Sequence, residues 1–360
     1  MAAVTVMGAQ GKTLTLNYDS TTNAQIAGQL ASIISNGVAN GTITPSQDEF
    51  LPLGAGQTGE YINTDPTLSI DPPGYDSIVD TSPNAVIIGN ADNNQMILAG
   101  DGNLTFLPAG GSGTIVGGNG NDRVIIPGGD KGDWSVSLGN GNNIVSSFGS
   151  GADTISVGTG HSLITLGSGP SAVSTLGDDT VEGGSGPATI SAVGAGPQVV
   201  YAGSGNLLFV GGDGGNTVFG GTGNETLFGG NGNDALHGGS GKDLIYAGDG
   251  NASLFAGSGT DTIYGGGGND TFVGGSGHAT MMAGYGSDVF TFIKGQAGGT
   301  DLVQGFNSSD KIALDGYGGG AVNDALKSQT MSAGSVTITL DDHTKVTFAD
   351  VSSLTKSNFT

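Results

Sequence analysis

The sequence predicts an all-β protein, a parallel β-roll in which short strands stack in successive coils. Residues 193–291 divide without insertion into eleven nine-residue units, each of which opens with a glycine-rich turn and ends in a short apolar run. Glycine supplies 72 of the 360 residues, yet large apolar residues remain frequent and evenly spaced. A fixed period of this length is typical of a stacked solenoid, and the even apolar spacing argues against a disordered glycine-rich chain.

Residues 1–83 lack this rhythm and predict a small α+β region. Residues 12–18 alternate between polar and apolar side chains, as a strand does. Thr22 and Gln25 form a capping-box pattern ahead of apolar residues at helical spacing, so we expect a helix to begin here. The helix should end at Asn36-Gly37 or Asn40-Gly41. The proline-rich stretch from 45 to 83 is predicted to be an extended connector or lid.

The nine-residue units fall into two groups. Over 211–291 most units place an acid or amide sixth and a large apolar residue eighth. Over 84–210 the turns keep their glycines and the apolar eighth place but mostly lack the acid. Three of these turns have proline at the fifth place (Pro170, Pro187 and Pro197), which fixes φ and favours a turn that forms without a ligand. An equally weighted alternative is that this half is decayed repeat sequence.

The glycine rhythm ends after Thr291. Four segments of alternating apolar residues follow and are expected to be strands: 300–306, 310–317, 335–342 and 344–351. An uncapped stack of coils would leave a row of unpaired backbone groups at its end. Residues 292–360 are therefore predicted to form a β-rich cap.

The sixth-place residues predict a cation site. Nine residues make half a coil of a two-sided roll, so residues 18 apart become neighbours at about 4.8 Å. Stacked carboxylates at this distance repel by roughly 3 to 4 kcal/mol at an effective dielectric near 20 unless a cation lies between them. Ca²⁺ prefers oxygen ligands in flexible geometry, and glycine turns can direct backbone carbonyls toward it. One column contains Glu225, Asp243 and Asp261, and the other contains Asn216, Asp234, Asp270 and Asp288.

The columns also rank the expected sites. The best pairs should be Glu225 with Asp243, Asp243 with Asp261, and Asp270 with Asp288. Sites next to the alanines at 252 and 279 should be weaker or missing. The eighth-place residues should point inward and stack as the core: Val218, Leu227, Leu236, Ile245, Leu254, Ile263, Phe272, Met281 and Phe290.

Charge narrows the set of partners. The chain has 32 acidic and 9 basic residues, a net charge of -23, which disfavours nucleic acid and anionic membranes and favours divalent cations. Cysteine is absent, so no disulfide can stabilise the fold, and calcium is expected in that role. No basic stretch followed by an apolar core opens the chain, and no apolar run approaches about 18 residues. We therefore expect neither a Sec-type signal peptide nor a membrane span.

The units resemble the repeats-in-toxin (RTX) family of secreted bacterial proteins, the haemolysin-type calcium-binding repeats. The resemblance is strongest over 211–291, weaker over 84–210 and absent from 1–83. It implies a calcium-filled parallel β-roll, export from a Gram-negative cell by type I secretion machinery, and an uncleaved secretion signal within 292–360. Carried over by position, the calcium ligands are the sixth-place aspartates Asp234, Asp243, Asp261, Asp270 and Asp288, with Glu225 and Asn216 as weaker substitutes and Asp122 and Asp153 as matches with poorer neighbours.

No catalytic constellation is found in the sequence. There is no HExxH motif and no GxSxG elbow. The four histidines are scattered over turns and strands: His161, His237, His278 and His343. Only residues 1–83 lie outside the repeats and the cap, which is too few for most catalytic domains. The chain is therefore predicted not to be an enzyme.

Two functions remain. The first is a secreted, extracellular or cell-surface structural protein that folds on calcium binding and self-assembles, through the ends of the solenoid or its N-terminal strand, into a biofilm matrix, S-layer or filament. The alternative is a secreted polysaccharide-binding or carbohydrate-active accessory module, which would bind sugar on the metal-poor face at 138–210. Trp134 is the only tryptophan and aromatic residues make up 6% of the chain, which weighs against the second function.

Overall fold

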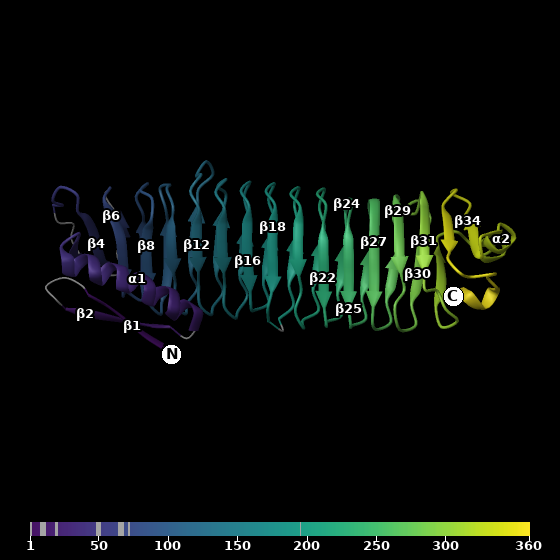
Figure 1. Cartoon of the computed structure of the whole chain (residues 1–360), viewed down its shortest axis with the longest axis horizontal. Coiled ribbons are helices and arrows are strands. Elements are labelled where there is room, and N and C mark those ends of the chain that lie inside the picture. The colour runs from purple at the N-terminus through teal and green to yellow at the C-terminus, as the bar shows by residue number, and fades with distance from the viewer. Residues whose placement is uncertain are drawn as a thin grey trace. The chain divides into compact units, whose positions relative to one another are not determined.

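The computed structural model describes residues 2–7, 12–18, 21–47, 52–63, 68–70, 73–194 and 196–360. The chain divides into two compact units, Met1–Pro187 and Ala188–Thr360. Each unit contains two parallel sheets whose strands alternate along the chain; Figure 1 labels the strands in order. The predicted all-β class and parallel β-roll are confirmed.

In the first unit, coils of unequal length stack into the two sheets. Gly113 pairs with Gln95 in the coil before it and with Trp134 in the coil after it, and the second step along the chain is longer than the first. Leu163 pairs with Thr180 across a step that is shorter than either. Sheet 1 consists of β3 (Ile43–Gln47), β4 (Thr58–Asn63), β6 (Tyr75–Asp80), β8 (Gln95–Ala99), β10 (Gly113–Val116), β12 (Trp134–Ser137), β14 (Asp153–Ser156) and β16 (Ser171–Thr175). Sheet 2 consists of β5 (Leu68–Ile70), β7 (Asn84–Ile88), β9 (Asn103–Leu107), β11 (Arg123–Ile126), β13 (Ile144–Ser147), β15 (Leu163–Thr165) and β17 (Thr180–Glu182).

In the second unit, the coils keep a constant length, twice the nine-residue unit, through most of the stack. Thr217 pairs with Ala235, and Thr271 pairs with Val289, as the nine-residue half-coil predicts. Its sheet 1 begins with β18 (Ala188–Ala192), β20 (Leu207–Val210), β22 (Thr226–Gly230), β25 (Leu244–Gly248), β27 (Ser258–Gly266) and β29 (His278–Met282), with the short β24 (Ser240–Gly241) beside β27. Its sheet 2 begins with β19 (Val199–Tyr201), β21 (Thr217–Phe219), β23 (Ala235–His237), β26 (Ser253–Phe255), β28 (Thr271–Val273) and β30 (Val289–Ile293).

The core lies between the two sheets of each unit. All nine eighth-place residues from Val218 to Phe290 are fully buried, so the prediction that they point inward is confirmed. Each buried side chain of this size contributes about 1.5 to 3 kcal/mol relative to exposure. The first unit is filled in the same way by Phe106, Ile126, Val145 and Ile155.

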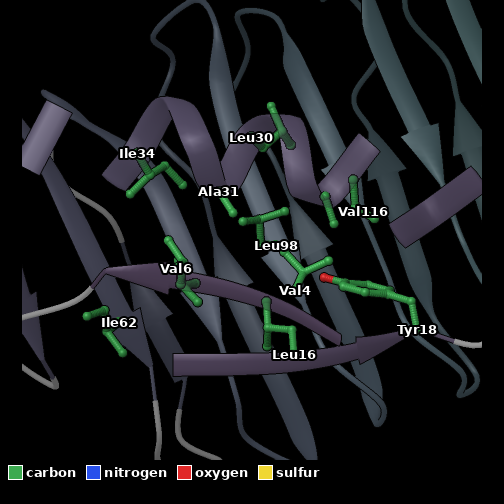
Figure 2. Packing of buried hydrophobic residues seen from close by; sticks show 12 residues of the cluster. Val4, Val6, Leu16, Tyr18, Leu30, Ala31, Ile34, Ile62, Leu98 and Val116 are labelled. Atoms are coloured by element: carbon green, nitrogen blue, oxygen red, sulfur yellow. The ribbon is translucent and has the colours of Figure 1, made fainter. Parts of the chain in front are cut away.

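The N-terminal elements cover the outer face of sheet 1 in the first unit (Figure 2). β1 (Ala2–Met7) and β2 (Thr13–Tyr18) form an antiparallel hairpin, and α1 (Thr21–Asn40) follows. Val6, Leu16 and Ile34 pack with Ile62 and Leu98 in one apolar cluster. The predicted strand is confirmed, and of the two predicted helix ends, the one at Asn40 is correct. The helix already begins at Thr21, so Thr22 lies in its first turn.

The stretch from 45 to 83 differs from the expected connector. β3, β4 and β6 are the first coils of sheet 1, and all pair in parallel. Pro45 in β3 did not prevent this, because β3 is an edge strand within the described residues and loses no ladder bond on its outer side. The β-roll therefore begins at β3 rather than near residue 84, although these coils lack the glycine rhythm.

The four strands predicted after Thr291 are present, but only part of them forms a cap. β31 (Thr300–Gln304) and β32 (Lys311–Asp315) add one more coil, in which Val289 pairs with Lys311 across a longer step than the regular coils have. β34 (Ser335–Thr339) and β35 (Lys345–Phe348) close sheet 1 with β33 (Thr330–Ser332). Sheet 2 ends where the Thr360 backbone N–H donates to the Ile312 carbonyl at 3.1 Å. The remaining elements are α2 (Ala321–Lys327) and a 3-10 turn (Lys356–Asn358); no helix in the described residues is long and apolar enough to cross a membrane.

Candidate metal centre

The sixth-place side chains lie inside the turns, immediately before the strands. Side chains alternate along a strand, so the sixth place shares the inward direction of the apolar eighth place. The second place needs glycine: Gly230 has a φ of 109°, and a Cβ there would overlap the carbonyl of Gly212 in the preceding coil. The nine predicted ligands are at most 3% exposed: Asp122, Asp153, Asn216, Glu225, Asp234, Asp243, Asp261, Asp270 and Asp288.

One carboxylate oxygen of each aspartate accepts a hydrogen bond from a backbone N–H of the adjacent coil. The Glu225 N–H donates to Asp243 Oδ1 at 2.9 Å, and the Asp270 N–H donates to Asp288 Oδ1 at 2.9 Å. The same bond joins Leu104 to Asp122 at 2.9 Å in the first unit. Where alanine interrupts a column, the Ala252 N–H still donates to Asp270 at 2.8 Å. The stacked carboxylates are thus separated by N–H donors, which relieves part of the repulsion expected from the sequence.

The second carboxylate oxygen is buried and has no partner in the described part of the chain. This holds for one oxygen each of Asp122, Asp234, Asp243, Asp261, Asp270 and Asp288, and for both oxygens of Glu225. Asp153 differs, because the Ser147 hydroxyl donates to its second oxygen. Leaving a buried acceptor unpaired costs about 1 to 3 kcal/mol, and more when it is charged. A row of such atoms indicates a missing positive partner.

Turns with a neutral amide at the sixth place show what the unpaired oxygens face. Asn143 Nδ2 donates to the carbonyls of Gly139 and Gly141, at 3.1 and 3.4 Å. Gln198 Nε2 donates to the Gly196 carbonyl at 3.1 Å, and Asn216 Nδ2 to the Gly214 carbonyl at 2.9 Å. The carbonyls at the second and fourth places therefore converge on the sixth-place side chain. When that side chain is a carboxylate, oxygen faces oxygen, and a cation satisfies both.

Burial raises the pKa of these carboxyls. Loss of hydration, followed by the neighbouring Asp243, raises the pKa of Glu225 to about 8. Loss of hydration is also the main cause for Asp270, whose pKa rises to about 7, and for Asp261 and Asp288, whose pKa rises to about 6. The pKa of Asp122 is raised in the same way, to about 7. Ionisation at neutral pH is therefore costly unless a cation accompanies it.

The available ligands suit calcium. No three Asp, Glu or His side chains converge anywhere in the described ranges, so each site must be completed by backbone carbonyls. Ca²⁺ accepts carboxylates and carbonyls at irregular angles, whereas Zn²⁺ prefers nitrogen and sulfur. The residues that would hold the ion are the sixth-place acids together with the second- and fourth-place carbonyls of the turns. Bound calcium would supply the positive charge that the unpaired oxygens lack.

The predicted ligands are not equivalent in the structure. Asp122 and Glu225 present unpaired oxygens, as the five consensus aspartates do. Asn216 does not: its amide donates to the carbonyls of Gly214 and Gly229, and its Oδ1 accepts the Gln198 N–H at 3.2 Å. Asp153 is satisfied by Ser147 and by the Trp134 N–H at 2.9 Å. These two residues are therefore weaker candidates than the rest.

Two aspartates that the sequence analysis missed extend the columns. Asp301 Oδ1 accepts the Ala279 N–H at 2.9 Å, its other oxygen is unpaired among the described residues, and burial raises its pKa to about 7. Asp310 accepts the Asp288 N–H at 3.0 Å and the Asn307 N–H at 2.8 Å. The longer coil interrupts the nine-residue period here. The local pattern is nevertheless kept, because Asp301 lies two places before the buried Val303, and this pattern could have predicted both aspartates.

Fifth-place asparagines form a second ladder that was also missed. Asn251 Oδ1 accepts the Asn269 N–H at 2.7 Å, and Asn103 Oδ1 accepts the Asn121 N–H at 2.8 Å. This ladder occurs in both units. It stabilises the turns without a metal, so the sixth place rather than the fifth distinguishes the calcium turns.

Fold and turns together define a calcium-binding β-roll. The family model of the RTX calcium-binding nonapeptide repeat (4 copies) matches residues 109–125, 210–245 and 246–281. The chain carries RTX calcium-binding repeats, and the resemblance inferred from the sequence is confirmed.

The solved structures that are similar to this chain include the extracellular lipase LipA from Serratia marcescens. It is 20% identical, with a TM-score of 0.31, over 53% of this chain and 40% of the lipase chain. The present chain thus spans less than half of that lipase, and so distant a likeness carries no argument about activity. No curated protein matches the chain. The family match falls on repeats alone, and the absence of enzyme activity stays a prediction.

Proposed function

We propose that this chain is an extracellular or cell-surface structural protein whose β-roll folds when it binds calcium. The observation that carries the proposal is the row of buried, unpaired carboxylate oxygens in the described part of the second unit. In low cytosolic calcium these acids oppose folding, which suits threading through a type I secretion channel. Outside the cell, binding of calcium to the folded state alone drives folding.

A calcium titration followed by far-UV circular dichroism tests this proposal. The β signal should rise as calcium is added to chelator-treated protein, and an equal concentration of Mg²⁺ should restore much less of it. Mg²⁺ is the matched control, because it has the same charge but demands a tight octahedral shell. Full β content in excess chelator would contradict calcium-driven folding.

Self-assembly is the second part of the proposal, and the hairpin β1–β2 is its best-supported route. The hairpin is a two-stranded sheet of its own, so its outer edges have no strand partner within the described residues. An open edge can pair with a strand of a second copy. The C-terminal end offers a shorter edge, because β33, the last strand of sheet 1, has three residues and the Thr360 bond covers the end of sheet 2. Electron microscopy with and without calcium tests assembly; monodisperse particles under both conditions would exclude a polymer.

A further inference from the structure

The first unit contains an open groove on the outer face of sheet 1, beside α1. Its volume is about 800 Å³, within the range of ligand sites in proteins. Its floor includes Thr114, Ser135 and Thr154, which are neighbours on β10, β12 and β14. One wall is formed by Ile33 of α1, whose side chain is 54% exposed. None of the turns whose sixth-place acid has an unpaired oxygen contributes a residue to the groove.

A long coil builds the opposite rim. The coil that joins Gly113 to Trp134 is longer than the one before it, and Figure 1 shows the turn before β12 rising above its neighbours. The turn is held by Asp130, whose carboxylate accepts the Trp134 indole N–H and the Gly132 N–H, both at 3.0 Å. Lys131 extends from this turn into the lining, is exposed and forms no ion pair in the described part of the chain. The rim is thus a fixed feature in which the positive charge of Lys131 lies close to the negative charge of Asp133, which also lines the groove.

A tight turn fixes the edge of the groove. Asn94 has a φ of 62°, in the left-handed region that asparagine adopts more readily than most residues. Its N–H donates to the hydroxyl of Ser112, another lining residue, at 3.3 Å.

We infer that this groove binds a segment of a linear polysaccharide. The hydroxyls of Thr114, Ser135 and Thr154 repeat at the strand spacing, about 4.8 Å, which is close to the length of one pyranose unit. Sugar hydroxyls can bond to this row while Ile33 and Met96 cover the C–H faces of the rings. Because Asp133 offsets the charge of Lys131 and the chain carries a net charge of -23, a neutral polysaccharide suits this lining better than one that contains carboxylated sugars.

The groove is less suited to a peptide. Extended peptides gain affinity by pairing with the free edge of a sheet. β10, β12 and β14 are interior strands, each paired on both sides, so their backbone groups are already bonded. Only side chains are available there. The groove also lies mostly before the face at 138–210 that the sequence analysis assigned to sugar.

Trp134 is the only tryptophan and borders the groove, but it is 1% exposed and packs against Phe106, so calorimetry is the main readout. Full-length protein in saturating calcium, shown first to be folded by circular dichroism, is titrated with a soluble neutral glucan and with a soluble uronate polymer. Calorimetry should show saturable binding of the neutral glucan, and the uronate polymer should bind less tightly because the chain carries a net charge of -23. Folding is measured separately, so failure of the proposed calcium-driven folding is distinguishable from failure to bind sugar.

The variants Thr114→Val and Ser135→Ala should each weaken binding several-fold, and the double variant about tenfold, through lost hydrogen bonds. Thr262→Val is the matched control, since Thr262 faces outward from sheet 1 in the second unit. If a variant unfolds, Thr154→Val at the exposed end of the hydroxyl row provides the same comparison with the neutral glucan. Equal binding by all variants and the wild type, no binding of either polymer, or tight binding of an extended peptide that displaces the polymer would overturn the inference.

Discussion

Each of the two units is a parallel β-roll, but their turns are completed in different ways. In the second unit most coils have one constant length, and the sixth place is mostly an unpaired acid. In the first unit the coils vary in length, and neutral amides such as Asn143 bond the turn carbonyls directly. The difference teaches that one kind of turn can be completed either by a side-chain N–H or by a cation. Only the second choice makes folding depend on the environment.

The outer faces of the two units are also stabilised in different ways. In the first unit α1 and the hairpin cover part of sheet 1. In the second unit aromatic side chains stack along the outside, with Tyr246 and Tyr264 at 4.4 Å and Tyr201 and Phe219 at 5.1 Å between ring centroids. Aromatic pairs of this kind contribute about 0.5 to 1.5 kcal/mol each. These ladders repeat because the coils that carry them have the same length, so regularity adds stability that the first unit obtains from its covering elements.

Removal of calcium should produce the largest difference in stability between the two units. We expect hydrogen exchange in excess chelator to show loss of protection through β21–β30, while β8–β14 stay protected. Each site saturated a hundredfold above its dissociation constant contributes about 2.7 kcal/mol to the folded state, so loss of several sites exceeds the stability of a typical domain. The first unit, measured in the same sample, is the internal control. Equal loss of protection in both units would refute the assignment of calcium dependence to the second.

Acidification should partly replace calcium. The folded-state pKa values of about 6 to 8 for Asp261, Asp288, Asp270 and Glu225 lie above those of unfolded carboxyls. The calcium-free folded state therefore binds more protons than the unfolded state, and its stability rises as pH falls from about 8 toward 4. We expect a gain of roughly 3 kcal/mol or more, because the pKa of each of the four carboxyls is raised by two units or more and one unit corresponds to about 1.4 kcal/mol before solvent screening. Urea unfolding of calcium-stripped, desalted protein at pH 8 and pH 5 measures it; lower stability at pH 5 would contradict the prediction.

Exchanging one residue between the units should exchange their behaviour. Asp270→Asn places an amide opposite the second- and fourth-place carbonyls and should stabilise the calcium-free second unit by about 2 kcal/mol. Asn143→Asp removes the bonds to Gly139 and Gly141 and should destabilise the first unit by a similar amount until calcium is added. Both variants keep an oxygen for the N–H of the adjacent coil, so each controls for the other. Unfolding with and without calcium measures both effects, and shifts of the same sign in the two variants would be incompatible with this account.

Much of the second unit followed from the sequence, because its repeat fixes side-chain direction, register and core. The sequence did not predict that the two oxygens of one carboxylate have different roles, one accepting a backbone N–H and the other left unpaired. Spacing placed Asp243 beside Asp261, but only the structure shows that Asp261 Oδ1 accepts the Asp243 N–H at 3.1 Å while the other oxygen stays unpaired among the described residues. The first coils of the roll were not predicted for a different reason. The coils from β3 to β6 have few glycines and unequal lengths, so the sequence shows no fixed period there, and Pro45 indicated a connector.

Glu60 offers the most specific test, because it is a buried acid outside the turns. It lies on β4 of the first unit, is fully buried, and neither of its carboxylate oxygens has a partner among the described residues. Burial raises its pKa to about 8, so the wild-type first unit loses stability as pH rises from about 4.5 to 8, while a Glu60→Gln variant does not. We expect Glu60→Gln to be more stable than the wild type by up to roughly 4 kcal/mol at pH 8.5, because each unit of the raised pKa corresponds to about 1.4 kcal/mol. At pH 5 the two should be nearly equal, since the wild-type acid is then protonated and a buried amide still lacks partners. Glu60 lies within a strand and not at the sixth place of a glycine turn, so added calcium should leave this difference unchanged. A calcium-dependent difference would show that burial of an acid outside the glycine turns is enough to make this fold respond to calcium.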